Sequence, residues 1–527
     1  MKGDLGRPTQ PPASTSAASS TPADTFTGNR GLRIEEPLIY EIGQPGQSGV
    51  DVPDPPAVTS RLGKHARKTV AGNPGLSEPE TVRHYVRLSR QNYAIDAGIF
   101  PLGSCTMKHN PRLNEKIARL PGFADIHPLQ PQSTVPGGLE LISKLAGWLV
   151  ELTGMTAVAM SPKAGAHGEF CGMLAIKAAL AARNEPRSVV LVPESAHGTN
   201  PATAATIGYE VVEVPARDDG TVDPAAVSER LSDQVAAIML TNPNTAGIFE
   251  RDVVAIAEAV HAAGAYFYAD GANFNAIVGK ATPGSLGVDA MHINLHKTFS
   301  TPHGGGGPGA GPVVLSEALA PFAPLPFVRV DDGRARMIET TEEAAAVGAQ
   351  PFGRLTAFHG QMGMFVRSLA YMLSHGGDGM RQASEDAVLN ANYVRAGLAD
   401  LMSQPYGDRP CMHEVLFDDG FLKDTGVTTL DFAKAMIDEG FHPMTVYFPL
   451  VVHGAMLIEP TESESRASLV LFIATLRDLV LRAKSGEVDR FQQAPTLAPR
   501  RRLDETGAAR KPILTYQPPP PFEAAAE

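Results

Sequence analysis

Short, continuous runs of apolar residues alternate with longer, mixed stretches between about residues 150 and 320. Uninterrupted apolar runs are typical of parallel strands that are covered on both faces, whereas strict alternation is typical of half-exposed strands. The runs that predict strands are Thr156 to Ser161, Val189 to Val192, Val235 to Leu240, Tyr266 to Ala269 and Met291 to Leu295. Stretches such as Pro224 to Leu231 and Val253 to Ala263 predict helices between them. This βαβ order predicts an α/β fold with a mostly parallel central sheet and helices on both faces.

The pattern changes after about residue 330. Gly360 to Ser374 and Arg381 to Met402 predict long helices, and a mixed region follows from Cys411 to Leu481. We expect this part to form a smaller α+β domain. The predicted organisation is a disordered tail over 1–35, an N-terminal arm with helices over 36–150, a large domain over 151–330, a small C-terminal domain over 331–484 and a tail over 485–527. The last tail includes Pro518 to Pro521, a run that only an extended chain accommodates.

Composition narrows the class of protein. The 527 residues are 43% hydrophobic and 19% charged, and the formal net charge of -12 comes without a basic stripe, so nucleic acid is not an expected partner.

No apolar run reaches the roughly 18 residues that a membrane span needs. Met1 to Asn29 lacks the apolar core of a secretory signal and carries few positive charges, so we predict a disordered tail rather than a transit peptide. Three cysteines are too few for a disulfide framework, and their spacing does not suggest a metal site. Because reduced thiols are typical of the cytosol, we expect a cytoplasmic protein.

Lys297 is the first candidate for chemistry. It follows the apolar run that ends at Leu295, stands beside His296 and precedes the glycine run Gly304 to Gly307. A lysine at a strand end in a buried site can act as a nucleophile and form a Schiff base, and the adjacent histidine can donate to a phosphate. A surface lysine beside a flexible loop fits these residues equally well.

Asp270 is the second candidate, because it ends the apolar run Tyr266 to Ala269. Carboxylates that end buried strands at a ligand crevice are commonly functional. Facing a pyridine nitrogen, such a charge keeps a pyridoxal ring protonated and makes it an electron sink. The alternative is that Asp270 caps a helix.

Gly165, Ala166 and His167 form a third feature, since they open an apolar helix straight after the strand predicted over Thr156 to Ser161. The free N–H groups at the start of a helix bind phosphate well. The stretch is neither a Walker A loop nor a GxGxxG motif, and many strand–glycine–helix turns bind nothing.

Two further polar stretches follow strands. His197 comes after the run that ends at Val192, where it could stack on a cofactor ring or serve the structure alone. Thr241 and Asn244 come after the run that ends at Leu240, where they could hydrogen-bond a ring hydroxyl or form an ordinary turn. Open α/β sheets bind ligands at the carboxyl ends of their strands. The order of phosphate cradle, stacking histidine, acidic residue and lysine therefore predicts one site at that edge.

This order resembles the large domain of fold-type I pyridoxal-phosphate enzymes, and further motifs narrow the resemblance to the glycine dehydrogenase (decarboxylating), or P-protein, family. The motifs that look like those of the family are Pro101 to Lys108, Ala164 to Glu169, Ser195 to Ala202, Leu295 to Phe299, Gly440 to Thr445, Ile458 to Glu462 and Arg501 to Glu505. The likeness covers roughly residues 37 to 515 and is specific, because unrelated families do not share this set. A fused P-protein is about twice as long, and this chain resembles its C-terminal, cofactor-bearing part, which is subunit 2 of split systems.

The resemblance implies a pyridoxal 5'-phosphate cofactor in the domain over 151–330, with Lys297 as its aldimine lysine, Asp270 at the ring nitrogen and His197 stacked on the ring. The other cofactor contacts that it implies are Ala272, Gly165, Ala166, His167, Thr241, Asn244 and His296. It implies no metal. The implied reaction is decarboxylation of glycine with transfer of the aminomethyl group to the lipoyl arm of the H-protein. The implied partner is subunit 1, in a heterotetramer with two copies of each subunit.

The chain departs from the usual family pattern at His109, at Gln361 and Met362, and at His453 and Gly454. None of these positions is the expected lysine or its acidic partner. Two other functions stay open. One is a different fold-type I reaction, such as amino-acid decarboxylation without a lipoyl acceptor or aminotransfer. The other is a catalytically silent subunit, which predicts a damaged lysine or acid.

Overall fold

The computed structural model describes residues 36–44, 47–50, 52–53, 56, 61–68, 75–127, 130–303, 309–357 and 359–515. The tail expected over 1–35, the glycine run from Gly304 to Gly307 and the proline run from Pro518 to Pro521 lie outside the described residues. The chain divides into two compact units. Unit 1 is Met1–Ala97, Ile437–Gly440 and Asp489–Glu527, and unit 2 is Gly98–Met436 and Phe441–Val488.

Unit 1 contains short helices, of which α2 (Glu78–Arg90) is the longest that is described. α2 begins at a capping box, because the Ser77 hydroxyl accepts from the N–H of Glu80 and the Glu80 carboxylate accepts from the N–H of Ser77. Glu36 is held against this helix by His84 and Arg87. The other helices of this unit are α1 (Ile39–Ile42), η2 (Gly63–His65), most of α15 (Val488–Gln493) and α16 (Glu505–Arg510).

Unit 2 is built on a seven-stranded sheet in the order β1-β7-β6-β5-β4-β2-β3. β7 runs antiparallel to both of its neighbours, and all other pairs are parallel. The strands are β1 (Ala157–Ala159), β2 (Val189–Pro193), β3 (Glu210–Val214), β4 (Val235–Thr241), β5 (Tyr266–Asp270), β6 (Ala290–His292) and β7 (Val313–Leu315). The predicted α/β fold with a mostly parallel sheet is confirmed.

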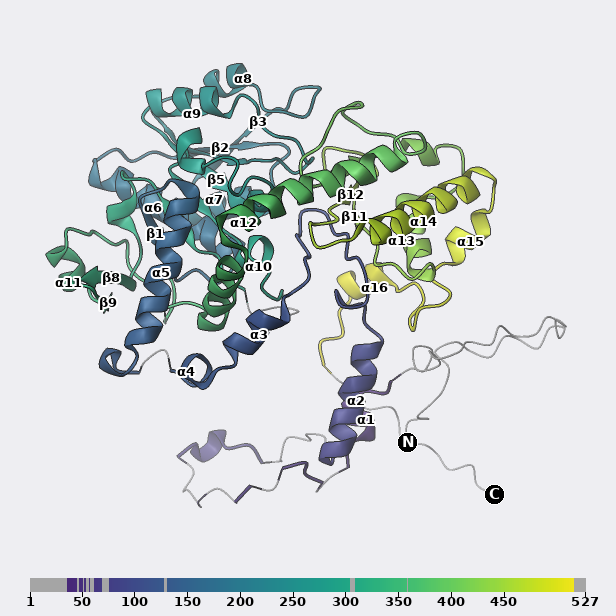
Figure 1. The fold of residues 1–527 in the computed structure, drawn as a ribbon, viewed down its shortest axis with the longest axis horizontal. Helices are drawn as coiled ribbons and strands as arrows, with labels where there is room; N and C mark the ends of the chain where they lie inside the picture. The colour runs from purple at the N-terminus through teal and green to yellow at the C-terminus, as the bar shows by residue number, and fades with distance from the viewer. Residues whose placement is uncertain are drawn as a thin grey trace. The chain divides into compact units, whose positions relative to one another are not determined.

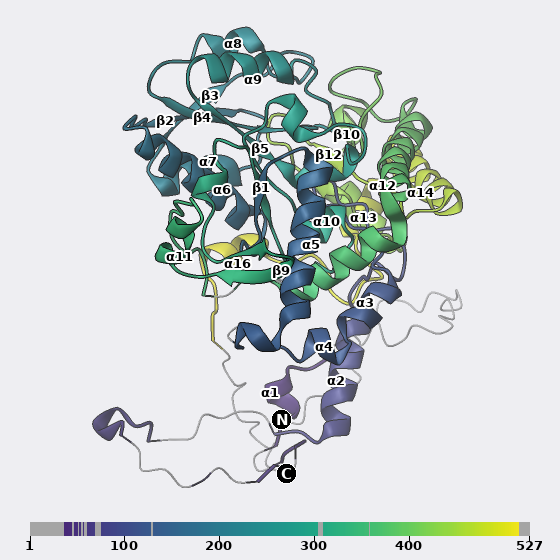
Figure 2. The ribbon, with the colours of Figure 1, turned by 60° about the vertical axis from the view of Figure 1, so that its left-hand side comes forward.

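Helices cover both faces of this sheet (Figure 2). Every residue of β4 is buried, and successive side chains enter opposite layers: Ile238 and Leu240 join one apolar core, and Met239 joins the other. The helices of the first core are α5 (Pro136–Thr153), α8 (Pro224–Ser228), α9 (Val253–Ala262) and the start of α12 (Met362–Leu398). Those of the second core are α6 (Gly165–Ala182) and α7 (Thr199–Ile207).

The expected strands agree with the structure except at the last one. The apolar run from Met291 to Leu295 was predicted as strand throughout, but β6 ends at His292 and the helical turn α10 (Leu295–Thr298) follows. The chain turns because the carbonyl of Asn294 accepts from the N–H groups of Lys297 and Thr298. β3 and β7 were not predicted: β3 is an edge strand with exposed positions, and β7 has only three residues.

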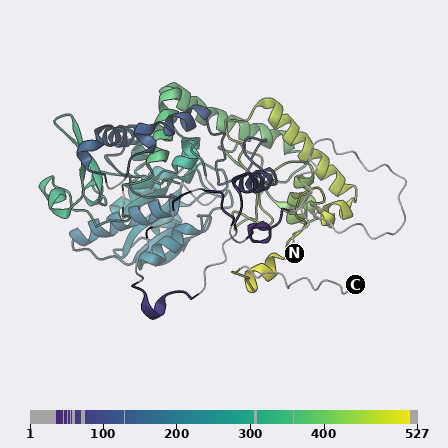
Figure 3. The same cartoon turned by 90° about the horizontal axis from the view of Figure 1, so that it is seen from below.

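The long helix α12 links the part of unit 2 that contains the seven-stranded sheet to a second part that contains a smaller sheet (Figures 1 and 3). Two helices were predicted here. α12 consists of two helices that meet at a kink at Gly376, whose φ of 65° is non-helical, so this prediction is confirmed. α12 contacts α5 near its start and α14 (Arg466–Lys484) further along. The second part of unit 2 contains a three-stranded antiparallel sheet in the order β10 (Val415–Phe417), β12 (Met456–Ile458) and β11 (Thr445–Val446). The helices η7 (Asp419–Leu422) and α13 (Thr429–Asp438) are nearby in the sequence.

Smaller elements complete unit 2. They are α3 (Arg112–Ala118), α4 (Pro121–Ala124), η3 (Gln132–Thr134), η4 (Gly271–Ala276), η5 (Pro283–Leu286), η6 (Ala320–Phe322), the hairpin β8 (Phe327–Asp331) and β9 (Arg334–Ile338), and α11 (Thr341–Ala346). Among the helices that the structure describes, none is long and apolar enough to cross a membrane.

Candidate active site

A cavity of about 420 Å³ lies at the carboxyl edge of the large sheet. Seven of the ten residues predicted from the sequence line it, and they come from four separate segments. They are Gly165 and Ala166 at the start of α6, His197 after β2, Asp270 and Ala272 at the end of β5, and His296 and Lys297 in α10. The topology thus brings together residues that are up to 132 positions apart, as the strand-end rule requires.

Lys297 is buried, with an exposed fraction of 8%. Its Nζ donates to the carbonyl oxygen of Ser104 at 2.8 Å. A single backbone acceptor orients the amine without neutralising it, because a carbonyl carries no net charge. The alternative of an exposed surface lysine is therefore wrong.

Asp270 both caps a helix and faces the cavity. One carboxylate oxygen accepts from the N–H of Ala272 at 2.9 Å, which caps η4, and the other accepts from Asn200 Nδ2 at 3.1 Å. Burial by itself raises the pKa of Asp270, but the charge of His292, the Ala272 N–H and the charge of Lys297 outweigh it and lower the pKa. Asp270 is therefore a buried carboxylate that stays ionised.

His292 is a site residue that the sequence interpretation missed. Its Nε2 lies 3.4 Å from Asp270 Oδ1, and its Nδ1 lies 2.6 Å from the hydroxyl of Tyr268. In the parallel register, Tyr268 pairs with Ala290, so the next step of two residues sets His292 beside Asp270. A polar residue at the end of β6 was the available signal, because the same rule had selected Asp270 at the end of β5.

The start of α6 fits an anion. Ala164 is extended and provides no side-chain cap, so the first N–H groups of the helix are free of a capping oxygen. A side chain at Gly165 would place its Cβ 2.8 Å from Asn294 Oδ1, so only glycine fits at this edge of the cavity. Burial, together with the nearby charges of His303 and Lys297, lowers the pKa of His296 to about 3, so its ring is neutral.

His197 lines the cavity. Its Nδ1 is 2.9 Å from the Thr199 hydroxyl, which in turn donates to Glu169 Oε1 at 2.7 Å. Its ring centroid is 5.6 Å from that of Phe448, which also lines the cavity. The imidazole is thus held from one edge, and its orientation is set by side chains of α6 and α7.

His167, Thr241 and Asn244 do not line this cavity. Asn244 is used by its own loop, since its Nδ2 donates to Gly220 O and Glu250 Oε1, and its Oδ1 accepts from backbone N–H groups. His167 Nδ1 accepts from the N–H of Lys163 at 3.2 Å. The bonds of Asn244 are those of the ordinary turn that the sequence left open as an alternative.

The family motif Pro101 to Lys108 forms one wall of the cavity through Gly103, Ser104 and Cys105. It pairs with β12: the Gly103 N–H donates to Leu457 O at 3.2 Å, and the N–H of Glu459 donates to Pro101 O at 3.3 Å. A Cβ at Gly103 would lie 2.2 Å from Leu457 Cγ, so this close approach requires glycine.

Lys108 anchors the far end of that segment. Its Nζ is 2.5 Å from Glu462 Oε1, 2.7 Å from Asn275 Oδ1 and 2.8 Å from Thr298 O. Burial lowers the pKa of Lys108, but the charge of Glu462 outweighs it and the pKa is raised. The segment that supplies the acceptor for Lys297 is therefore fixed by a buried ion pair.

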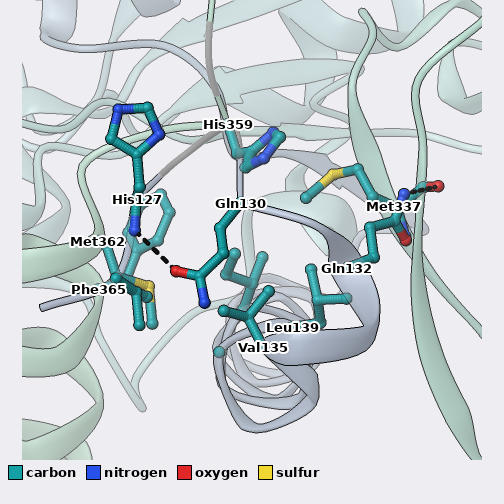
Figure 4. Close-up of a pocket in the computed structure, with 13 residues that line it drawn as sticks. His127, Gln130, Gln132, Val135, Leu139, Met337, His359, Met362 and Phe365 are labelled. Atoms are coloured by element: carbon teal, nitrogen blue, oxygen red, sulfur yellow. Dashed lines mark hydrogen bonds between the residues drawn. The ribbon is translucent and has the colours of Figure 1, made fainter. Parts of the chain in front are cut away.

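A second cavity, of about 210 Å³, lies between the starts of α5 and α12 (Figure 4). Its lining is mainly apolar and includes Leu139, Met362 and Phe365. Gln132 bridges the backbone of Met337, accepting its N–H at 2.8 Å and donating to its carbonyl at 3.2 Å. None of the residues predicted for the site lines this cavity, and its two glutamines, Gln130 and Gln132, both bind the local backbone, so we assign no chemistry to it.

Two family descriptions match this chain: "Glycine dehydrogenase, C-terminal domain" over residues 383–500, and "Aminotransferase class-V" over residues 169–310. A probable glycine dehydrogenase (decarboxylating) subunit 2 of Caulobacter vibrioides is 65% identical over 99% of this chain and 100% of its own length. The protein of the same name in Listeria innocua is 45% identical over 92% of this chain and 99% of its own length.

A solved structure agrees with these matches in fold. The inhibitor-bound glycine decarboxylase (P-protein) of the glycine cleavage system has a TM-score of 0.65 and 22% sequence identity, over 79% of this chain and 92% of its own. The expected fold-type I architecture is confirmed by this likeness.

Proposed function

This chain belongs to the glycine dehydrogenase (decarboxylating) subunit 2 family, and from that membership we propose that it decarboxylates glycine at a pyridoxal phosphate carried by Lys297. The family resemblance seen in the sequence is confirmed. The observation that carries the proposal is the pairing of Lys297 with an ionised, buried Asp270 in one cavity. The silent-subunit alternative predicts damage to one of these two residues, and both are intact.

The cavity fits pyridoxal phosphate on three counts. Asn294 Oδ1 and His296 Nδ1 are buried polar atoms without a hydrogen-bond partner among the described residues, and both side chains line the cavity. Gly165 leaves room for an anion at the uncapped start of α6. The negative charge of Asp270 suits a protonated pyridine nitrogen.

Each side chain then has a defined task. When bound, the cofactor supplies an electron sink for the bond that breaks at the glycine α-carbon. Lys297 would hold the cofactor covalently, and Asp270, kept ionised by His292, would keep the proton on the ring nitrogen. His197 would flank the ring. Gly165, Ala166 and His296 would bind the phosphate, and the N–H of Ala272 stabilises the charge of Asp270. We leave His167, Thr241 and Asn244 out of this site.

Partners follow from the family and its chemistry. The name subunit 2 implies a partner subunit, and we propose a subunit 1 in a heterotetramer with two copies of each chain. The acceptor of the aminomethyl group would be the lipoylated H-protein, whose disulfide takes the carbon while carbon dioxide leaves.

The first test is covalent attachment of the cofactor. Wild-type protein loaded with pyridoxal phosphate should show an aldimine absorbance that borohydride abolishes by fixing the cofactor to Lys297, and Lys297→Ala should show neither. Lys163→Ala is the matched control, because burial lowers the pKa of Lys163 to about 8 and makes it the competing nucleophile near the cavity. A reducible band that persists in Lys297→Ala and disappears in Lys163→Ala would refute the assignment.

The second test separates glycine cleavage from other fold-type I reactions. With a subunit-1-like partner, the chain should exchange labelled bicarbonate into glycine, and lipoylated carrier should raise the rate. Exchange that ignores the carrier would favour a decarboxylase without a lipoyl acceptor, and transamination without exchange would favour an aminotransferase.

A further inference from the structure

Three titratable side chains, His413, Glu414 and Glu459, form a fully buried cluster behind the cavity wall. One donor atom of each lies within 4.8 Å of the other two. Glu414 precedes β10 and Glu459 follows β12, and the register pairs Val415 with Ile458. The next antiparallel pair is therefore Glu414 opposite Glu459, an arrangement in which like charges repel.

Hydrogen bonds on this pair are few. Glu414 Oε2 accepts from the N–H of Ser104 at 2.7 Å, and Oε1 lies 3.3 Å from Asn273 Nδ2. Neither oxygen of Glu459 and neither nitrogen of His413 makes a hydrogen bond of good geometry among the described residues. Two full negative charges are thus poorly solvated here, and one proton between them removes the repulsion.

Lys297 is one cation that acts on both carboxyls, and neither His413 nor Lys108 provides a second one to neutralise the pair. Burial and the charge of Lys297 together lower the pKa of His413 to about 3, so the ring is neutral. Lys108 is committed to its ion pair with Glu462. The charged groups that act on the pair are Lys297 on α10, Lys108 and Glu462. His413 Nε2 lies 3.8 Å from Glu459 Oε1, and both carboxylates raise the pKa of Cys105.

Electrostatics agree with this geometry. Burial raises the pKa of Glu414 well above its usual range, and the charge of Glu459 raises it further. Burial also raises the pKa of Glu459, against the opposing effects of Thr106 and Lys297. Because the two carboxyls titrate together, the proton belongs to the pair and to neither residue alone.

Ser104 connects the pair to the reaction cavity. Its N–H binds Glu414, and its carbonyl binds the Nζ of Lys297. The two ends of one residue therefore hold the carboxyl pair and the proposed cofactor lysine, which places a proton store next to the cavity.

The proposed reaction consumes a proton. Glycine, as the zwitterion, loses carbon dioxide; its methylene carbon bonds to one sulfur of the lipoyl disulfide, and the S–S bond breaks. The second sulfur leaves with the electron pair as a thiolate and takes one proton to become a thiol. The product aminomethyl group keeps its ammonium charge, so the balance is one glycine, one disulfide and one proton in.

We propose that Glu414 and Glu459 hold one proton between them at neutral pH and supply it to the thiolate that forms at the Lys297 cavity. The supply part of this inference rests on the proposed function, whereas the shared proton does not. Lys297 lines the cavity and its charge acts on both carboxyls, so in this proposal it carries the proton from the buried pair and returns one to it after the product leaves.

Infrared spectroscopy of the full chain loaded with pyridoxal phosphate tests the shared proton directly. At pH 7 we expect a protonated-carboxyl stretch, and Glu459→Gln and Glu414→Gln should each remove the contribution of the pair, whereas the contribution of Glu250, whose pKa burial raises to about 7, should persist. Glu115→Gln is the matched control: the hydrogen bond of Arg367 lowers the pKa of Glu115, so that carboxyl contributes no such band. A band unchanged in both pair variants overturns the proposal. Circular dichroism checks that each variant folds, and either variant alone decides the question if the other does not.

Metal analysis tests whether a divalent cation, rather than a proton, occupies the cluster of His413, Glu414 and Glu459. Two carboxylates and an imidazole are also divalent-cation ligands. Wild-type protein exposed to Zn²⁺ or Mn²⁺ and then desalted should retain no stoichiometric metal. One equivalent of metal per chain that both pair variants lose would overturn the proton-store assignment.

The supply step is tested with subunit 1 and the lipoylated carrier. Glu459→Gln should lower the rate of aminomethyl transfer about 100-fold, the low end for general acid catalysis, with an unchanged KM for glycine. A transfer rate and pH profile equal to wild type would overturn the supply step. If wild type transfers nothing to the carrier, the proposed function fails instead, while the infrared result still decides the shared proton.

Discussion

Replacing Lys108 by methionine should strongly destabilise unit 2. The ammonium group makes its closest contact, at 2.5 Å, with Glu462 Oε1, and the side chains are 2% and 12% exposed. Removal leaves the Glu462 carboxylate without its cation and deprives Asn275 Oδ1 and Thr298 O of a donor. Breaking one side of a buried ion pair costs about 3–5 kcal/mol, because the remaining charge is desolvated and unpaired.

The double variant Lys108→Met with Glu462→Met separates the charge effect from packing. Two apolar side chains of similar volume leave no uncompensated charge, so we expect the double variant to recover part of the loss. A cost of about 1–3 kcal/mol should remain, because Asn275 Oδ1 and Thr298 O still lack their donor. Lys280→Met is the matched control, since its partner Glu385 is 2.8 Å away but the two side chains are 50% and 37% exposed. That change should cost less than about 1 kcal/mol.

Urea unfolding followed by the fluorescence of the single tryptophan, Trp148 in α5, measures these differences. A cost below about 1 kcal/mol for Lys108→Met, or a double variant as unstable as that single variant, would refute the reasoning. Because Lys108 fixes the segment that holds Lys297, the single variant should also release its cofactor more readily, which the aldimine absorbance reports.

Three further changes probe other contacts. Gly103→Ala places a Cβ 2.2 Å from Leu457 Cγ and should cost about 1–3 kcal/mol in urea unfolding; an unchanged midpoint would mean that the segment is free to shift. Burial raises the pKa of Glu459 from 4.5 to about 7 within its pair with Glu414, so the pair should make wild type lose about 1.4 kcal/mol of stability per pH unit, relative to Glu459→Gln, as the pH rises through that window and no more above it; parallel pH–stability curves would contradict this. His292→Phe removes the imidazole that holds the Asp270 pKa down, so the cofactor absorbance should become pH-sensitive at a higher pH than in wild type, and an unchanged titration would exclude this role of His292.

The central sheet could be predicted because its strands are buried on both faces. All seven residues of β4 are apolar or small enough to pack, so the run from Val235 to Leu240 predicts a strand from its own sequence, without knowledge of the neighbouring strands. The location of the site followed from topology, since parallel strands deliver their carboxyl ends to one edge. This rule singled out Asp270 and Lys297 as candidates, and the family resemblance then assigned their roles.

Residues whose placement depends on register or on distant contacts were not predicted. His292 reaches Asp270 only because β6 pairs with β5 in one particular register. Glu414 reaches Ser104 across 310 positions of sequence. Asn244 was wrongly included in the site for a different reason. A polar turn after a strand has the same local sequence whether its amide binds a ligand or, as here, binds its own loop.

The pairing of Pro101 to Gly103 with β12 has a consequence for the order in which the molecule assembles. Contacts that close long loops form late in folding, because the entropy of the loop is lost before the contact stabilises anything. The acceptor for the Lys297 amine is built by residues at both ends of unit 2. A nascent chain that already contains Lys297 and Asp270 therefore still lacks the wall that orients the lysine until β12 has been synthesised. Premature termination before that point would yield a protein with its reactive amine present and its environment missing.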